Sequence, residues 1–179
     1  MIYCFLAEGF EEIEALTPVD VLRRCGKEVV TVGIGEEIIT GAHGISVCTD
    51  ITEVDLVPND EIEMIILPGG MPGTLNLEKN RSVQDTIDYC VKNDKYIAAI
   101  CAAPSILGHK KLLDGKPATC FPGFEEQMGG AVMTGEKVVA ADKIITAKGA
   151  GAALEFGLKL AEILCGKPRA EKLAASMQC

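Results

Sequence analysis

The sequence predicts an α/β fold with a doubly wound, mostly parallel sheet covered by helices on both faces. Short, continuously apolar runs recur along the chain, and amphipathic stretches of helical period separate them. Right-handed crossovers between such strands place helices on both sides of the sheet. The 179 residues correspond to about one domain, which buries roughly 70% of its unfolded surface. We therefore expect a single domain over residues 1–179.

The first half of the chain supplies three strands and two helices of this pattern. Apolar residues 2–7 form the first strand, and an amphipathic helix over about 11–25 ends before Gly26. The β-branched run 28–33 is the second strand. Residues 36–50 are expected to be irregular or to form short edge strands. A buried strand over 63–70 then runs into Pro68 and two glycines, and a helix covers 81–93.

The second half of the chain repeats the alternation. Residues 96–101 read as another buried strand, and 138–149 as two strands around a tight turn. Apolar residues at helical spacing predict a helix over 151–165, which Gly166 and Pro168 stop. In such sheets ligands bind beyond the carboxyl ends of the strands. Segments 8–14, 68–74 and 101–104 are therefore the places to look for a site.

Charge and hydropathy argue against two classes of partner. The 17 basic and 26 acidic residues give a net charge of −9, which repels nucleic acid and anionic lipid. No apolar run reaches the ~20 residues of a membrane helix, and the N-terminus lacks the basic leader of a signal peptide. We expect a cytoplasmic protein with no nucleic-acid and no membrane partner.

The eight cysteines do not predict a metal centre. No pair has C-x-x-C spacing, and the only histidines are His43 and His109, a poor ligand set for zinc. We expect no metal and no cofactor, and we expect most of the cysteines to be reduced, buried thiols.

Cys101 is the exception, because of its place in the pattern. It ends the predicted strand 96–101 and directly precedes Ala102, Ala103 and Pro104, and proline suits a first helical turn. A thiol at a sharp strand-to-helix turn meets free amide donors and the positive end of a helix dipole, which favour the thiolate and lower its pKa. The alternative is one more buried thiol; we favour a functional cysteine.

Glu14 lies on the apolar arc of the first helix, near Pro18, Val21 and Cys25, when each residue is given 100°. A carboxylate facing a core is costly unless it is protonated, hydrogen-bonded or at a cleft. Glu14 is thus a candidate acid/base partner with a raised pKa. An ordinary first-turn acid favoured by the helix dipole is the alternative. The edge of the sheet that it shares with Cys101 favours function.

The glycine turn after the 63–70 strand offers backbone donors. Glycine permits a positive φ and lets N–H groups turn inward. The N–H groups of Gly70 and Ala102 can together stabilise an oxyanion on a carbonyl that Cys101 attacks. A turn that merely requires glycine is the alternative. A second glycine pair, Gly149 and Gly151, lacks the third glycine of a dinucleotide-binding motif and is only a weak hint of phosphate binding.

Taken together, these motifs resemble the DJ-1/ThiJ/PfpI superfamily, on its DJ-1 (ThiJ) branch. The resemblance covers nearly the whole chain and rests on G-F-E-E-I-E followed by P-V-D, on L-P-G-G at 67–70, on A-A-I-C-A-A-P at 98–104 and on the T-A-K-G-A-G turn. It implies a flavodoxin-like α/β sandwich, usually a homodimer. It also implies that Cys101 is the reactive cysteine, that Glu14 is hydrogen-bonded to its sulfur, and that Gly70 and Ala102 are the backbone donors.

The resemblance implies several activities. Family members are described as cofactor-free glyoxalases that convert methylglyoxal to lactate, as deglycases, as oxidative-stress sensors whose cysteine becomes a sulfinate, and as chaperones; some carry thiamine-synthesis names. Two departures matter. Ala102 stands where the peptidase branch has histidine, which argues against a protease. Phe121 stands where many DJ-1 relatives place a histidine, which leaves Glu14 as the obvious proton carrier.

Three functions follow from these residues. The first is a cysteine-dependent enzyme that acts on a small 2-oxoaldehyde or a glycated substrate, with Cys101 as nucleophile and Glu14 as acid/base. The second is a redox sensor in which Cys101 is oxidised. The third, a nucleotide-binding flavodoxin-like module, needs better phosphate-binding glycines than this chain has.

Overall fold

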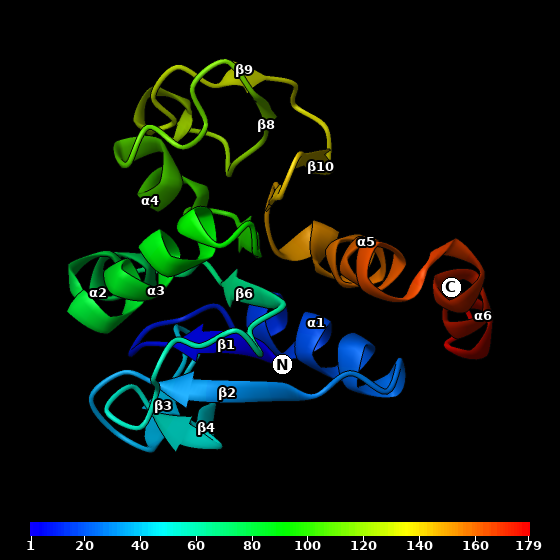
Figure 1. The fold of residues 1–179 in the computed structure, drawn as a ribbon, viewed down its shortest axis with the longest axis horizontal. Coiled ribbons are helices and arrows are strands. Elements are labelled where there is room, and N and C mark those ends of the chain that lie inside the picture. The colour runs from blue at the N-terminus through cyan, green and yellow to red at the C-terminus, as the bar shows by residue number, and fades with distance from the viewer.

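The computed structural model describes residues 1–179 and is built around a seven-stranded sheet (Figure 1). The strands lie in the order β10-β11-β7-β6-β1-β2-β5. All neighbouring pairs are parallel except β10 and β11, which are antiparallel. The expected doubly wound, mostly parallel sheet is thus confirmed. Its strands are β1 (Ile2–Leu6), β2 (Val29–Gly33), β5 (Ile51–Thr52), β6 (Met64–Leu67), β7 (Tyr96–Ile100), β10 (Val138–Ala141) and β11 (Ile144–Ala147).

The central strands are apolar along their whole length because helices cover both faces of the sheet. Every residue of β1 and of β6 is buried, as expected of parallel strands packed on two sides. In the register, Ile2 pairs with Val29 of β2 on one side and with Met64 of β6 on the other. These pairings bring the carboxyl ends of neighbouring strands to one edge.

The helices divide the core into two halves. One half, under a first group of three helices, contains Phe10, Phe156 and Leu160. The other half, under a second group of three helices, contains Phe5 and Ile87. Figure 1 shows α1 and α5 running side by side, with α6 beyond them. The first group is α1 (Glu12–Arg24), α5 (Ala153–Cys165) and α6 (Lys167–Ser176), and the second is α2 (Gly73–Lys79), α3 (Arg81–Lys92) and α4 (Pro104–His109).

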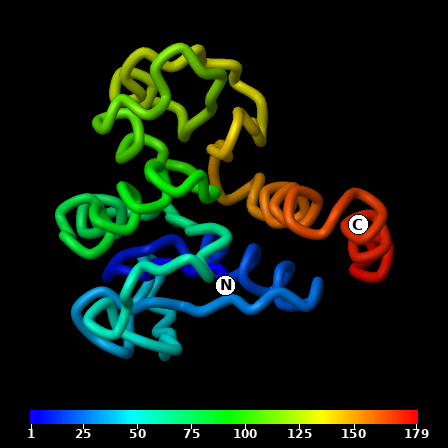
Figure 2. Tube along the Cα trace, viewed as in Figure 1, coloured from blue at the N-terminus to red at the C-terminus, as the bar shows by residue number.

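Two small sheets lie outside the main one. β3 (Ile38–Thr40) and β4 (Ser46–Cys48) form an antiparallel hairpin, whereas β8 (Pro117–Ala118) and β9 (Val132–Met133) pair in parallel. The hairpin lies at one end of the molecule and the β8–β9 region at the other (Figure 2). The expected edge strands within 36–50 therefore make their own sheet, and 51–52 complete the main sheet instead. Short 3₁₀ turns occur at η1 (Glu125–Gln127) and η2 (Ala150–Ala152).

The helix ends differ slightly from the predicted ones. Cys25 is the C-terminal cap of α1 rather than part of it, and α5 begins at Ala153 because the preceding residues form the 3₁₀ turn η2. Gly166, with φ of 84°, ends α5 as expected, but α6 follows at once. A transmembrane span would need a longer and more apolar helix than any in this chain.

Candidate functional site

Four turns meet at the carboxyl edge of the sheet and form the candidate site. Cys101 follows β7, the glycine pair Gly69–Gly70 follows β6, and Gly149 follows β11, while Glu14 lies in the first turn of α1, after β1. The sequence predicted Cys101, Glu14 and the 68–74 turn at one edge because each follows a strand of an expected parallel sheet. The fold brings them together there, where doubly wound sheets bind their ligands.

Cys101 occupies a sharp turn that its neighbours fix on both sides. Its φ is 66°, in the left-handed region that residues with a Cβ disfavour. Its N–H donates to the carbonyl of Ala147 over 2.9 Å, and its carbonyl accepts from the N–H of Phe121 over 2.8 Å. Pro104 begins α4 three residues later, as predicted. The turn leaves the thiol partly exposed rather than sealed in the core.

Glu14 is a buried carboxyl group aimed at this turn. It is 1% exposed, and its Oε2 accepts from the N–H of Gly69 over 3.0 Å. Its Oε1 is buried with no hydrogen-bond partner. The carboxyl group lies beside Cys101, because a methyl group on Gly69 would lie 2.6 Å from Oε2 of Glu14 and 3.1 Å from the Cys101 sulfur. A buried acid with one free oxygen beside a thiol is suited to holding and passing a proton.

Gly69 is required because the two reactive side chains close around it. A methyl group in place of its α-hydrogen would lie 2.6 Å from the Cβ of Cys101 and 2.6 Å from Oε2 of Glu14. Gly70 has a φ of 90°, which turns its N–H toward the site. The backbone N–H groups of Gly70 and Ala102 lie near the Cys101 sulfur and lower its pKa. Their role as donors to a substrate oxyanion stays a prediction.

The pKa values of the pair follow from burial. Burial raises the pKa of Glu14 to about 7, although its bonds with Cys101 and Gly69 lower it. Burial, and then the charge of Glu14, raise the pKa of Cys101 to about 12, against the lowering contribution of the Ala102 and Gly70 N–H groups. The expected low pKa of Cys101 is therefore wrong, chiefly because the thiol is largely buried. Once Glu14 is protonated its charge no longer opposes the thiolate, so the two groups share one proton.

Comparisons with known proteins decide the family. The model of the DJ-1/PfpI family matches residues 1–163. The chain belongs to the DJ-1/PfpI family. It is 33% identical to Protein DJ-1 homolog B of Arabidopsis thaliana over 96% of this chain, which spans only 40% of that longer relative. It is 34% identical to Glutathione-independent glyoxalase DJR-1.2 of Caenorhabditis elegans, over 93% of this chain and 89% of that one.

A solved structure agrees with this membership. Toxoplasma gondii DJ-1 in an oxidized form superimposes with a TM-score of 0.94 at 35% identity, over 99% of this chain and 97% of that one. The resemblance to the DJ-1/ThiJ/PfpI superfamily stated from the motifs is thus confirmed, together with the flavodoxin-like fold.

The DJ-1/PfpI site opens toward a hollow that Phe121 borders. The hollow has a volume of about 400 Å³ and is lined by Phe121, Pro122, Lys137, Lys148 and residues 149–152. It adjoins the acid, because a methyl group on Gly149 would lie 3.8 Å from Oε1 of Glu14 and 3.2 Å from the Phe121 ring. Phe121 is 46% exposed. An aromatic wall therefore stands where many relatives were expected to have a histidine, and it offers no proton.

Glu12 and His43 join α1 to the β3–β4 hairpin, a contact that the helical wheel missed. Glu12 is only 5% exposed although it is charged, because the hairpin covers it. Burial alone would raise the pKa of Glu12, but hydrogen bonds with His43 and the backbone lower it. Oε1 accepts from the His43 N–H over 2.8 Å, and Oε2 lies 3.0 Å from His43 Nδ1. Sequence could not pair them, since 31 positions separate the two.

Glu11, Glu12 and His43 also form the one group of potential metal ligands, with their ligand atoms within 4.8 Å of one another. Both oxygens of Glu12 are already engaged with His43. A histidine–carboxylate ion pair accounts for this arrangement. His109 lies on the surface and pairs with Glu78.

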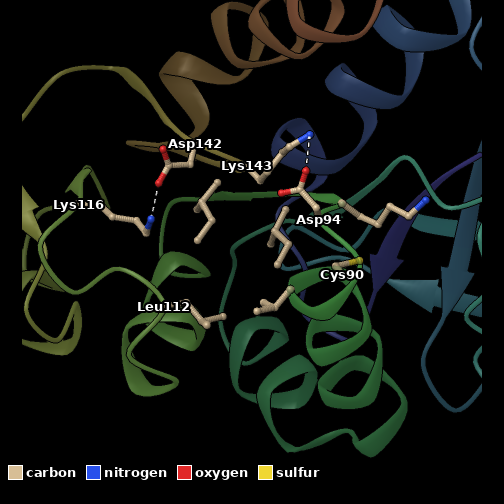
Figure 3. Close-up of a pocket in the computed structure, with 10 residues that line it drawn as sticks. Cys90, Asp94, Leu112, Lys116, Asp142 and Lys143 are labelled. Atoms are coloured by element: carbon tan, nitrogen blue, oxygen red, sulfur yellow. Dashed lines mark hydrogen bonds and ion pairs between the residues drawn. The ribbon is translucent and has the colours of Figure 1, made fainter.

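The largest hollow lies at the opposite edge of the sheet, near the amino ends of β7 and β11. It has a volume of about 620 Å³ and holds none of the predicted site residues. Figure 3 shows two ion pairs among its charged groups, Lys116 with Asp142 and Lys143 with Asp94. Lys95 donates to the carbonyl of Asp60. With these charges mutually satisfied, the hollow offers no evident reactive group.

Proposed function

We propose that this DJ-1/PfpI protein is a cofactor-independent enzyme that converts a small 2-oxoaldehyde, such as methylglyoxal, to a 2-hydroxy acid, such as lactate. The observation that carries the proposal is the buried Glu14 carboxyl group that meets Cys101 around Gly69 and whose charge raises the pKa of the Cys101 thiol. The C. elegans relative named a glutathione-independent glyoxalase supports the same substrate class. A glycated substrate, on which a deglycase would act, presents related carbon–oxygen chemistry.

In the first step, the Glu14 carboxylate takes the proton of the Cys101 thiol as the sulfur adds to the aldehyde carbon, and it then gives that proton to the aldehyde oxygen. The product is a hemithioacetal bound to Cys101, and Glu14 is left as a carboxylate. While negative charge develops on that oxygen, the Gly70 and Ala102 N–H groups are positioned to stabilise it, since both already point at the sulfur. A pKa of about 7 for Glu14 suits both directions of proton transfer near neutrality.

In the next steps, the Glu14 carboxylate removes the proton from the former aldehyde carbon, giving an enediol. The same proton then returns to the neighbouring carbon, and the hydroxyl proton of the former aldehyde oxygen passes to the neighbouring oxygen, which leaves a thioester of the 2-hydroxy acid on Cys101. Water attacks the thioester carbonyl, the carbon–sulfur bond breaks, and Glu14 recovers a proton. The net reaction adds one water to the oxoaldehyde, with no oxidant or reductant.

The test is the formation of lactate from methylglyoxal without glutathione. We expect turnover by the unmodified protein and none by Cys101→Ala. Cys120→Ala is the matched control, because Cys120 is a buried free thiol near the same turn and should keep the activity. Equal turnover by the unmodified protein and Cys101→Ala would refute the proposal.

A second candidate function, a redox sensor, rests on the same donors. Hydrogen bonds from Gly70 and Ala102, together with a protonated Glu14, would also stabilise the oxygens of a Cys101 sulfinate. The Toxoplasma gondii relative was solved in an oxidized form. Mild peroxide should then add two oxygens to Cys101 before any other cysteine, as peptide mass spectrometry would show. Oxidation spread evenly over all eight cysteines would exclude this role.

We further propose that the protein acts as a cytoplasmic homodimer, each copy a single domain. Ile13 on α1 and Ile45 on the hairpin are 54% and 55% exposed, and both line a hollow of about 450 Å³ together with Ala150. Exposed apolar side chains gathered around a hollow are a common mark of an interface. All eight cysteines are free, as a reducing compartment would keep them.

A further inference from the structure

Two cysteines far from the site come together at the opposite end of α1 and α5. Cys25 caps the C-terminus of α1, and Cys165 is the last residue of α5. Both helices start at the site edge of the sheet and run to the other edge side by side (Figure 1). The pair is therefore separate from Cys101, and the inference does not depend on the proposed function.

The packing of the two helices sets the two cysteines at one level. α1 and α5 approach closely at Gly157, where a methyl group would lie 3.2 Å from the Cα of Pro18. Cys25 follows Pro18 by about two helical turns, and Cys165 follows Gly157 by about two turns as well. Parallel helices in contact at one level remain neighbours two turns later, and both cysteines pack against the same half of the core.

The two thiols interact, and a cation accompanies them. Burial first, and then the neighbouring Cys165 sulfur through its charge and a side-chain hydrogen bond, raise the pKa of Cys25. Arg169, in the first turn of α6, lies near Cys25, and its charge lowers the pKa of Cys25 against this rise. A small hollow of about 190 Å³ at this end of the molecule is bordered by Arg169, Arg24 and Lys172. Three basic residues thus gather here although the net charge of the chain is −9.

Exposure gives the two thiols different roles. Cys25 is 8% exposed, whereas Cys165 is partly exposed, so an oxidant reaches Cys165 more readily. Arg169 opposes the rise in the pKa of Cys25 and so assists formation of its thiolate. A partly exposed thiol next to a cation-assisted one is the arrangement in which a sulfenate is resolved by a neighbour.

We propose that Cys25 and Cys165 form a redox-active dithiol that a hydroperoxide converts into a reversible disulfide between α1 and α5. The Cys165 thiolate attacks the hydroperoxide, the oxygen–oxygen bond breaks, and Cys165 becomes a sulfenic acid while the leaving oxygen takes the thiol proton. The Cys25 thiolate then attacks the Cys165 sulfur, the sulfur–oxygen bond breaks, and water leaves with the second proton. Two thiols are oxidised and one hydroperoxide is reduced to water and an alcohol, or to two waters.

The test uses the full chain with Cys101→Ser, so that Cys101 does not consume the oxidant. After near-stoichiometric hydrogen peroxide, free thiols are blocked with N-ethylmaleimide, and the protein is digested without reductant. We expect a peptide pair joined through Cys25 and Cys165 that dithiothreitol separates, and a higher melting temperature for the oxidised protein. Recovery of both cysteines as separately blocked peptides, or of Cys165 joined to another cysteine, would overturn the proposal.

Variants show whether the neighbours act as proposed. Cys25→Ser and Cys165→Ser should each abolish the cross-link and the rise in melting temperature, whereas Cys48→Ser, at an exposed cysteine on the distant hairpin, should leave both unchanged. Arg169→Gln should slow cross-linking several-fold while the final yield stays the same. An unchanged rate in Arg169→Gln would contradict the role given to Arg169.

Discussion

At the scale of single residues, Cys101 holds a backbone conformation that its own side chain disfavours. A φ of 66° costs a residue with a Cβ about 1–2 kcal/mol. The hydrogen bonds to Ala147 and from Phe121 hold the turn in place. The strained turn directs the sulfur toward Gly70, Ala102 and Glu14. The fold is therefore less stable at Cys101, the residue that we expect to react with the substrate.

The strain can be measured with two variants that both lack the sulfur. Cys101→Ala keeps the Cβ in the left-handed region, whereas Cys101→Gly removes it. We expect the free energy of unfolding of Cys101→Gly to exceed that of Cys101→Ala by about 1 kcal/mol, because relief of the strain outweighs the greater flexibility of unfolded glycine. Urea unfolding measures both values. A less stable glycine variant would show that the turn is not strained.

Glu14 makes the stability of the fold depend on pH. Its pKa rises from 4.5 to about 7 on folding, so the native state binds a proton that the unfolded state has lost between these values. Its stabilising contribution is complete below pH 4.5 and is lost as the pH rises through about 7. We expect the melting temperature of the unmodified protein to fall from pH 5 to pH 8 more steeply than that of Glu14→Gln. Parallel curves for the two proteins would contradict the raised pKa.

At the scale of elements, the contact of α1 with α5 connects the site to the far edge of the sheet. α1 carries Glu14, and the 3₁₀ turn η2, which leads into α5, contains Ala150, whose N–H lies near the Glu14 carboxyl group. Gly157 permits the close approach of the two helices. Their packing therefore sets the position of the acid.

A methyl group at Gly157 should disturb this packing. It would lie 3.2 Å from the Pro18 Cα and 3.2 Å from the Val21 Cβ, closer than most real contacts. We expect Gly157→Ala to lower the free energy of unfolding by about 1–3 kcal/mol, as urea unfolding would show. Gly151→Ala is the control, because nothing lies within 4 Å of its added methyl group. Equal free energies of unfolding for the two variants would mean that α1 and α5 move apart without losing stability.

The elements most readily predicted were those with the strongest local pattern. The buried strands, the α3 helix and the β10–β11 turn follow from apolar runs and helical spacing, and Pro104 marked the start of α4. The missed α6 follows Gly166 and Pro168, which signal a helix end; here Pro168 lies in the first turn of α6, where proline is tolerated. The β3–β4 hairpin could not be assigned because its main anchor, the contact of Glu12 with His43, joins distant parts of the chain.

At the scale of the whole molecule, sequence predicted the position of the site better than its electrostatics. Cys101, Glu14 and Gly70 were predicted to lie at one edge because each follows the carboxyl end of an expected parallel strand. The pKa of the thiol depends on burial and on the charge of Glu14, and neither can be measured without coordinates. The role of Gly69 between the two side chains likewise emerged only from the packing.

The proposed homodimer gives a prediction of mass. We expect light scattering after size exclusion to report twice the 19.0 kDa of one chain. Ile13→Lys and Ile45→Lys, which place a charge on the exposed apolar surface, should shift the mass toward one chain. Asp20→Lys, on an exposed face of the same helix, is the control and should remain a dimer. A single-chain mass for the unmodified protein would contradict the dimer.

The central claim is that Cys101 and Glu14 act as one proton-sharing pair, and Glu14→Gln tests it most directly. The measurement is the pH profile of Cys101 alkylation by iodoacetamide, recorded beside methylglyoxal turnover. Because the Glu14 charge raises the pKa of Cys101, the account predicts that in Glu14→Gln alkylation sets in at a lower pH, while turnover falls by about a hundredfold or more. An unchanged alkylation profile, or a variant that turns over as fast as the unmodified protein, would contradict it.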